Sequence, residues 1–218
     1  MTFFDFYSRP RIQELTKGEY DSHGIADSGT PLEPSVNTLR KMYKETGWDK
    51  MDTGAKQFYV DHVSGGYTKR GDYYINNKGQ EVLAYTRRNF WDRNTSSLSF
   101  SKAAFGSKIK LGFLMTHELG HSTINLDSSL NSFLQVKTKN GYEPELLYPG
   151  AQGELGKLTI EHGAIWGIER DFLKLNGLTK LPGVFDSSLE YIFDNYILKS
   201  SQFKHVYDKI KHLPVKIK

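Results

Sequence analysis

The sequence predicts an α+β fold, with a β-rich N-terminal half and a helical C-terminal half. A hairpin pattern within residues 58–101 and a series of long helical patterns after it lead to this prediction. A chain of 218 residues fits one large domain. We therefore expect a single domain, 1–218, in which residues 1–126 form a β-rich lobe ending in a long helix and residues 127–218 form a helical lobe.

The composition indicates a folded core and restricts the chemistry. Hydrophobic residues make up 38% of the chain and aromatic residues 13%, which is more than a disordered chain carries. The net charge of +4 is mostly scattered along the sequence, so we expect no nucleic-acid partner. No cysteine is present, which leaves His, Asp and Glu as the ligands of any transition metal.

Two patterns describe the chain before the β-rich part. Residues 18–34 are rich in Gly, Asp, Ser and Pro and predict a loop. A helix is expected from Pro34 to about Thr46, because proline favours a first helical turn and Gly47 favours a helix end.

The hairpin is the clearest β pattern. The strands predicted at 73–75 and 81–85 flank residues 76–79, Asn-Asn-Lys-Gly, which favour a tight turn. Residues 98–101 alternate apolar and polar side chains, as a half-buried strand does. These segments make residues 58–101 the β-rich part of the chain.

A long helix is expected from Lys108 to about Leu126. It carries no charge between Lys110 and Glu118, and its apolar residues lie on all sides, which predicts a buried, central position. Its two glycines lower helix propensity but let neighbouring elements approach closely.

Two more helices are expected in the C-terminal half. One spans about 154–176 and ends at Gly177. The other begins at a capping box, 187–190, and runs to about Lys211. The basic residues after Ser200 predict a solvated helix face and a frayed tail.

The 108–126 helix carries the motif that points to function. His117 and His121 are four residues apart, so both side chains leave one face of the helix and can bind one zinc ion. Glu118, next to the first histidine, can reach a metal-activated water and act as general base. The alternative is a pair of core histidines with an exposed Glu118 between them. We favour the metal, because two histidines and a carboxylate on a buried helix need partners.

The segment 116–122, Thr-His-Glu-Leu-Gly-His-Ser, resembles the active-site helix of zincin metallopeptidases. This resemblance implies a zincin-like fold, a zinc cofactor and hydrolysis of peptide bonds. Metzincins continue the motif with a glycine and a third His or Asp, whereas this chain has Ile124 and Asp127 there and no methionine after the motif. Peptide deformylases use a cysteine ligand, which this chain lacks. The remaining pattern resembles the gluzincins, in which a Glu from a later helix completes the site.

The next predicted helix supplies a candidate for that third ligand. Glu161 lies within an apolar stripe, so its carboxylate needs a strong partner such as a metal. His162 and Glu169 share a flank of this stripe, where each could orient a ligand or replace Glu161 as one. Asp127 is a further alternative ligand, and Glu161 could instead bind Arg170 or water.

The resemblance also implies a mechanism. Zinc held by His117, His121 and Glu161 lowers the pKa of its water to about 7, and Glu118 passes the proton of that water to the leaving nitrogen. Zincins bind an extended substrate beside a sheet edge, which we expect at 98–101. The oxyanion needs a further donor, and each candidate also has an ordinary structural alternative. The candidates that follow the motif are Tyr148, Tyr191, His205 and Tyr207.

The lack of cysteine, the hairpin and the two-helix site together resemble the metallopeptidase toxin domains of bacterial polymorphic toxins, including those carried by Rhs repeat proteins. That resemblance implies a domain cut from a larger toxin, a protein or peptide substrate, and a cognate immunity protein as partner. The sequence has no signal-peptide pattern and no stretch long enough to span a membrane. We therefore expect delivery by a specialised secretion system, or alternatively a cytoplasmic protein, and no membrane insertion.

Two other functions fit the same motif. A non-peptidase zinc hydrolase would cut another amide, for example in cell-wall peptide, with the same activated water. A non-catalytic module would hold a structural metal in a closed ligand shell, whereas a hydrolase needs an open position. Substitution of Glu118 separates the catalytic functions from the structural one.

Overall fold

The computed structural model describes residues 12–25, 29–89, 91–92, 94–139, 141–147, 159–178 and 198–218. The fold is α+β, as the sequence predicts, with strands concentrated in the N-terminal half and helices in the C-terminal part. The described strands are β1 (Ile12–Thr16), β2 (Ala55–Val60), β3 (Thr68–Arg70), β4 (Tyr73–Ile75), β5 (Glu81–Arg88), β6 (Ser96–Phe100), β7 (Gln135–Thr138) and β8 (Gly141–Pro144). The described α-helices are α1 (Lys17–Ser22), α2 (Val36–Glu45), α3 (Lys108–Leu126), α4 (Ser128–Phe133), α6 (Ile160–Leu175) and α8 (Ser201–Ile210).

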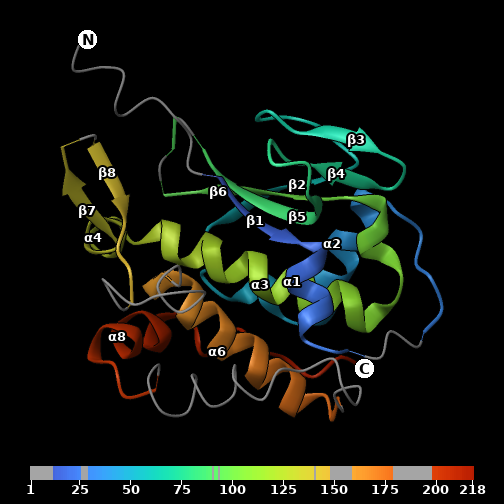
Figure 1. Ribbon diagram of the computed structural model, residues 1–218. Helices are drawn as coiled ribbons and strands as arrows, with labels where there is room; N and C mark the ends of the chain where they lie inside the picture. The colour runs from blue at the N-terminus through green and yellow to red at the C-terminus, as the bar shows by residue number, and fades with distance from the viewer. Residues whose placement is uncertain are drawn as a thin grey trace.

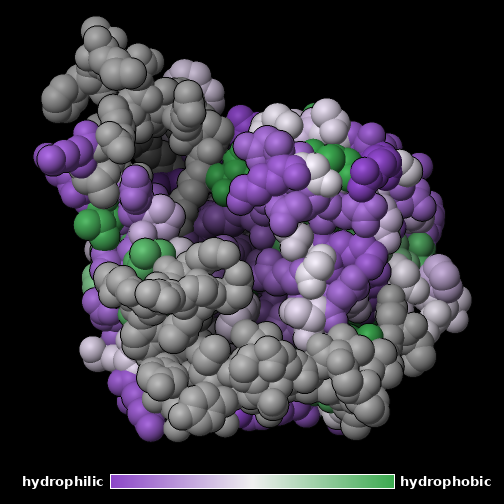
Figure 2. Space-filling view, viewed as in Figure 1, coloured by the Kyte–Doolittle hydropathy of each residue, from purple (hydrophilic) through white to green (hydrophobic). Residues whose placement is uncertain are grey.

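Helix α3 lies at the centre of the molecule, between the main sheet and a layer formed by α6 and α8 (Figure 1). Its contacts with β5 on one side and with α6 on the other are the most extensive that it makes. On the face shown in Figure 2, the described residues are mostly hydrophilic and apolar side chains are scattered, because most apolar residues pack around α3. No helix in the described ranges is long and apolar enough to cross a membrane.

The main sheet has six strands, in the order β2-β6-β5-β4-β3, with β1 paired to β5. Strands β2 and β6 are parallel, and the other pairs are antiparallel. Strand β6 lies between β2 and β5, and all of its residues are buried. The strand predicted at 98–101 is therefore an interior strand. The expectation of a substrate-binding edge there is wrong, because both sides of β6 already carry backbone hydrogen bonds.

The predicted hairpin is confirmed. Strands β4 and β5 pair antiparallel, with Tyr74 opposite Val82. The side-chain oxygen of Asn76 accepts hydrogen bonds from two backbone N–H groups of the turn. Gly79 takes a φ of 77°, a conformation that suits glycine.

The N-terminal segment differs in part from its prediction. Within the predicted loop 18–34 the structure has the short helix α1, which is capped by the Thr16 hydroxyl accepting the N–H of Glu19. The helix predicted from Pro34 is confirmed as α2, which the Ser35 hydroxyl caps. Gly47 follows this helix with a φ of 83°, as a helix-ending glycine does.

Helix α3 has the predicted bounds and the predicted central position, with all residues 111–125 buried. A Cβ at Gly120 would lie 2.4 Å from Cδ1 of Ile165, and one at Gly112 would lie 2.8 Å from Cδ1 of Ile217. Both distances are too short for carbon atoms in contact. The two glycines therefore allow α6 and the C-terminal tail to pack directly on the α3 backbone.

Helix α6 begins later than predicted. Thr159 is extended, and its hydroxyl accepts the N–H of His162. This cap starts the helix at Ile160, so the predicted start near Glu154 is wrong. Gly177 follows the helix end, as predicted, with a φ of 62°.

Helix α8 lies within the second of the two helices predicted in the C-terminal half, the one expected from 187–190 to about Lys211. The Ser200 hydroxyl caps it by accepting the N–H of Phe203, so this helix begins at Ser201. The predicted capping box at 187–190 lies outside the described residues.

The C-terminal tail is held against the core, so the prediction of a frayed tail is wrong. Leu213 is buried, and its carbonyl accepts a hydrogen bond of 2.8 Å from the indole N–H of Trp48. The Asn176 side chain donates to the carbonyl of Val215 and accepts the N–H of Ile217. These contacts join the tail to both the N-terminal half and α6.

Candidate metal centre

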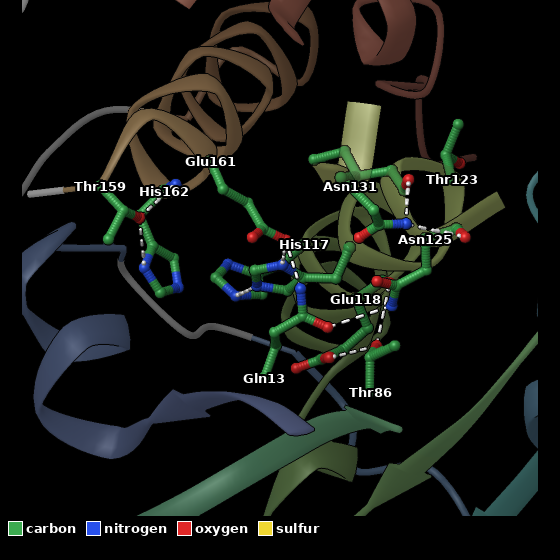
Figure 3. A network of polar contacts seen from close by, with 12 residues as sticks. Gln13, Thr86, His117, Glu118, Thr123, Asn125, Asn131, Thr159, Glu161 and His162 are labelled. Carbon is green, nitrogen blue, oxygen red and sulfur yellow. Dashed lines mark hydrogen bonds and ion pairs between the residues drawn. The ribbon is translucent and has the colours of Figure 1, made fainter. Parts of the chain in front are cut away.

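Three histidines from α3 and α6 converge in the core (Figure 3). His117 and His121 are fully buried, and their Nε2 atoms face each other across 3.0 Å. The His162 ring, from the first turn of α6, lies 5.2 Å from the His121 ring between centroids. One nitrogen from each ring can be chosen so that all three lie within 4.8 Å of one another. The group could therefore hold one metal ion.

Local structure explains why the three rings meet. The four-residue spacing places the two α3 histidines on one helix face. The Thr159 cap starts α6 so that His162 occupies its first turn. Gly120, next to His121, lets α6 approach α3 closely.

A carboxylate from α6 lies against the outer nitrogen of each α3 histidine. Glu161 Oε1 is 2.8 Å from Nδ1 of His121, and Glu169 Oε1 is 2.7 Å from Nδ1 of His117. Such a contact keeps a proton on Nδ1 and directs the Nε2 lone pair to the opposite side of the ring. Glu161, which the gluzincin resemblance places on the metal, thus contacts the outer edge of a histidine, and the third nitrogen of the group comes from His162.

The inward-facing nitrogens fit a metal ion. Two Nε2 lone pairs 3.0 Å apart repel each other unless a cation or a proton lies between them. Imidazole nitrogen suits zinc, copper, nickel and iron. Three protein ligands also leave one position of a tetrahedral zinc site for water or substrate, as catalytic sites require.

Glu118 lies beside the histidine group and is fully buried. The expectation, within the core-histidine alternative, that Glu118 is exposed is therefore wrong. The Thr86 hydroxyl on β5 lies 2.6 Å from Oε2 of this carboxylate and 3.0 Å from the Glu118 carbonyl oxygen. Among the described residues, Oε1 has no hydrogen-bond partner. Burial raises the pKa of Glu118 to about 8, against the opposing effects of His117 and the Thr86 hydrogen bond.

Glu169 favours the protonated form of His117 when no metal is bound. Burial lowers the pKa of His117, but the charge and hydrogen bond of Glu169, with contributions from Glu118 and Glu19, raise it to about 9. Burial raises the pKa of Glu169, yet the neighbouring His23 and His117 bring it well below its usual value. Both shifts favour an imidazolium–carboxylate pair, and a metal ion bound by His117 would displace the imidazolium proton.

The structure adds residues that the sequence motifs did not indicate. Gln13 on β1 donates its side-chain N–H to Glu161 Oε1, and the Asn125 side chain donates to the Gln13 oxygen at 3.1 Å. His23, after α1, has its Nε2 atom 3.2 Å from Glu169 Oε2. One signal could have indicated Gln13, because the two-residue period of a strand places it on the same buried face as an apolar neighbour, Leu15.

Other residues considered for the site have different roles. Asp127 caps α4 by accepting two backbone N–H groups. Tyr207 donates to Asp171 on α6, and His205 packs edge-on against Phe133. Two further oxyanion candidates, Tyr148 and Tyr191, lie outside the described residues.

Comparison with protein-family models, with curated proteins and with solved structures gave no match. The zincin, gluzincin and toxin resemblances therefore stay predictions from the sequence. Function has to be argued from the chemistry of the histidine group and of the residues around it.

Proposed function

We propose that this chain is a zinc-dependent peptidase with a zincin-like active site. One observation carries the proposal: three histidines converge, with the Nε2 atoms of His117 and His121 facing each other, while a buried Glu118 stands beside them with one carboxylate oxygen accepting no hydrogen bond from the described residues. His117, His121 and His162 would hold the metal. Glu161 and Glu169 would orient the two α3 rings, so the third ligand differs from the Glu that the gluzincin resemblance implies.

Each residue near the metal has a chemical task. When bound, zinc acidifies water and polarises the substrate carbonyl. The positive charge of the bound metal would favour the carboxylate form of Glu118, and Oε1 would then accept the proton of the attacking water and deliver it to the leaving nitrogen. The Thr86 hydroxyl holds Oε2 at 2.6 Å, which leaves Oε1 available for this proton transfer. A metal with a purely structural task would have no use for this carboxylate.

The sheet beside α3 supports an extended peptide as substrate. Within the described ranges, β1 pairs with β5 alone, and its Gln13 side chain reaches Glu161 at the metal group. Figure 2 shows a hollow with hydrophilic residues at its floor, over α3 and beside the start of β1 in the same view. A peptide added along β1 would pass this group, in the manner of strand addition.

The decisive experiment compares the wild-type chain with Glu118→Gln on a mixture of unstructured peptides, with cleavage read by mass spectrometry. The variant should retain zinc and lose at least about a hundredfold in rate, the usual contribution of a general base. Equal rates in both proteins would refute the peptidase proposal. Cleavage confined to cell-wall peptides would favour the non-peptidase amide hydrolase, and stoichiometric zinc without any cleavage would favour a structural metal.

Metal content identifies the third ligand. We expect about one zinc per chain in the wild type, no stoichiometric zinc in His162→Ala, and weakened but measurable binding in Glu161→Ala. If Glu161→Ala lost stoichiometric zinc and His162→Ala retained it, Glu161 would be the third ligand. Absence of any transition metal after zinc has been offered would mean that the α3 histidines are core residues.

The toxin resemblance leads to a separate proposal, that the active domain harms bacterial cells and is neutralised by a cognate inhibitor. Expression of wild-type chain in the bacterial cytoplasm, beside Glu118→Gln, tests it. Growth arrest by wild type alone would support a toxin. Equal growth of both strains at equal protein levels would contradict it.

A further inference from the structure

The two carboxylates that contact the α3 histidines are themselves contacted by the N-terminal segment. Gln13 donates to Glu161 Oε1, the oxygen that lies 2.8 Å from His121 Nδ1. Figure 3 shows the Gln13 amide directed towards this carboxylate beside the histidine rings. A second set of contacts involves Glu169: its Oε1 meets His117, and its other oxygen lies 3.2 Å from His23 Nε2, a close contact without hydrogen-bond geometry.

The orientation of the Gln13 amide is determined by its surroundings. The residue is 7% exposed, and its oxygen accepts from Asn125 Nδ2 at 3.1 Å. Because Asn125 donates to the oxygen, the amide nitrogen must face Glu161. Strand pairing fixes the backbone as well, since Gln13 lies directly opposite Thr86, the residue that binds Glu118.

His23 is held in place by the packing of its ring and by its position at the end of α1. Its ring lies edge-on to Phe113 of α3, with 4.9 Å between centroids, and its side chain is 12% exposed. Its backbone N–H closes the end of α1 by donating to the carbonyl of Tyr20 at 3.1 Å. Helix α1 therefore presents this imidazole to Glu169 from the side opposite His117.

We propose that Gln13 and His23 are positioning residues that set the metal affinity of the site by holding Glu161 and Glu169. The inference rests on the metal site of the proposed function. A carboxylate bound only to a histidine can rotate, and the ring then loses its orientation. A carboxylate fixed at a second contact keeps the Nδ1 proton in place and the Nε2 lone pair directed inward. The β1–α1 segment, far from the metal motif in sequence, would thus complete the site.

The test measures zinc affinity by competition with a chromogenic chelator, in the full chain. Gln13→Leu and His23→Leu each remove one contact, and each should weaken zinc binding by about 10- to 100-fold, as loss of a ligand-orienting partner does. His23→Gln keeps an N–H donor and should recover most of the affinity. Two exposed residues of the same types, Gln57 and His62, supply matched controls as Gln57→Leu and His62→Leu.

Paired substitutions distinguish positioning from a general loss of packing. If Gln13 acts through Glu161, then Gln13→Leu should weaken zinc binding no further in a Glu161→Gln background. The same reasoning applies to His23→Leu in a Glu169→Gln background. Circular dichroism of the metal-free proteins confirms folding, and Gln13→Ser replaces Gln13→Leu if the latter does not fold.

The outcomes separate this inference from the proposed function. A wild-type chain that binds no zinc refutes both. A wild-type chain that binds zinc, with both leucine variants within threefold of it, refutes the positioning role alone. Additive losses in the paired variants also overturn it, because they would show that Gln13 and His23 act independently of the carboxylates.

Discussion

Helices α3 and α6 meet along one interface but contribute different chemistry to it. Helix α3 supplies two histidines four residues apart, whereas α6 supplies two carboxylates eight residues apart. The two histidines are separated by about 6 Å along the axis of α3, and the two carboxylate residues by about 12 Å along the axis of α6. The long Glu side chains must therefore converge to reach the more closely spaced histidines. They meet in reverse order, Glu169 with His117 and Glu161 with His121. The histidine spacing is a property of one helix, whereas the positions of the carboxylates depend on how the helices cross.

The largest expected difference, between the α3 histidines and the α6 carboxylates that contact them, lies in metal binding. His121→Ala should abolish stoichiometric zinc, because it removes a ligand, whereas Glu169→Gln should retain zinc with about 10- to 100-fold weaker affinity. Thermal unfolding with and without zinc measures both effects. Zinc at 100 times its Kd should stabilise the wild type by about 2.7 kcal/mol and His121→Ala not at all. Equal losses in the two variants would contradict the distinction between ligand and orienting residue.

The helix crossing itself is tested by Gly120→Ala. The new methyl group would meet Ile165 and Ile168, and such overpacking costs about 1–3 kcal/mol in the free energy of unfolding. Gly18→Ala on α1 is the matched control, since a Cβ added there would meet no atom within 4 Å, and at this position alanine should stabilise by about 0.5–1 kcal/mol. Urea denaturation measures both changes. A neutral Gly120→Ala would show that α6 does not need this close approach.

The smallest expected effect concerns Asp127, the alternative ligand at the end of α3. Its carboxylate caps α4, so Asp127→Ala should cost about 1 kcal/mol of stability and leave zinc affinity unchanged. Chelator competition and urea denaturation on the same sample provide the two readings. A drop in zinc affinity would restore Asp127 as a candidate ligand.

Local patterns predicted the elements whose causes are local. The bounds of α3, the 76–79 turn and the end of α2 before Gly47 depend on nearest neighbours along the chain, and the structure confirms them, whereas α2 begins two residues after the predicted Pro34. The start of α6 was predicted too early. Thr159 is extended and pairs with Leu146, but the apolar stripe around it in the sequence gives no sign of this pairing and favours a helix. Strand β1 was not anticipated, since its partner β5 lies much later in the sequence.

The candidate site divides in the same way. His117, Glu118 and His121 lie close together on about one turn of a helix, so their spacing in the sequence was sufficient to predict that their side chains are neighbours. Glu161 drew attention because it lies within the apolar stripe of α6, and it is indeed buried. The half-buried His162 was considered only as an alternative ligand or a residue that orients one, because its place beside the two buried α3 histidines depends on how α6 crosses α3.

Gln13 and His23 show the limit of reading contacts from sequence. Gln13 meets Glu161 across 148 positions of chain, and no spacing rule connects residues so far apart. A polar residue on a buried strand face requires some partner, but the strand alone does not say which one.

The two hydrogen bonds between the Asn176 side chain and the C-terminal tail have a consequence for hydrogen exchange. Amide protons near a chain end normally exchange with solvent at almost unprotected rates, because terminal segments open easily. The N–H of Ile217 is instead bound to Asn176 Oδ1 at 2.7 Å, while Ile217 Cδ1 covers Gly112. Its deuterium uptake should therefore be slow and should follow that of α3, so that an amide next to the terminal Lys218 reports on the opening of the central helix.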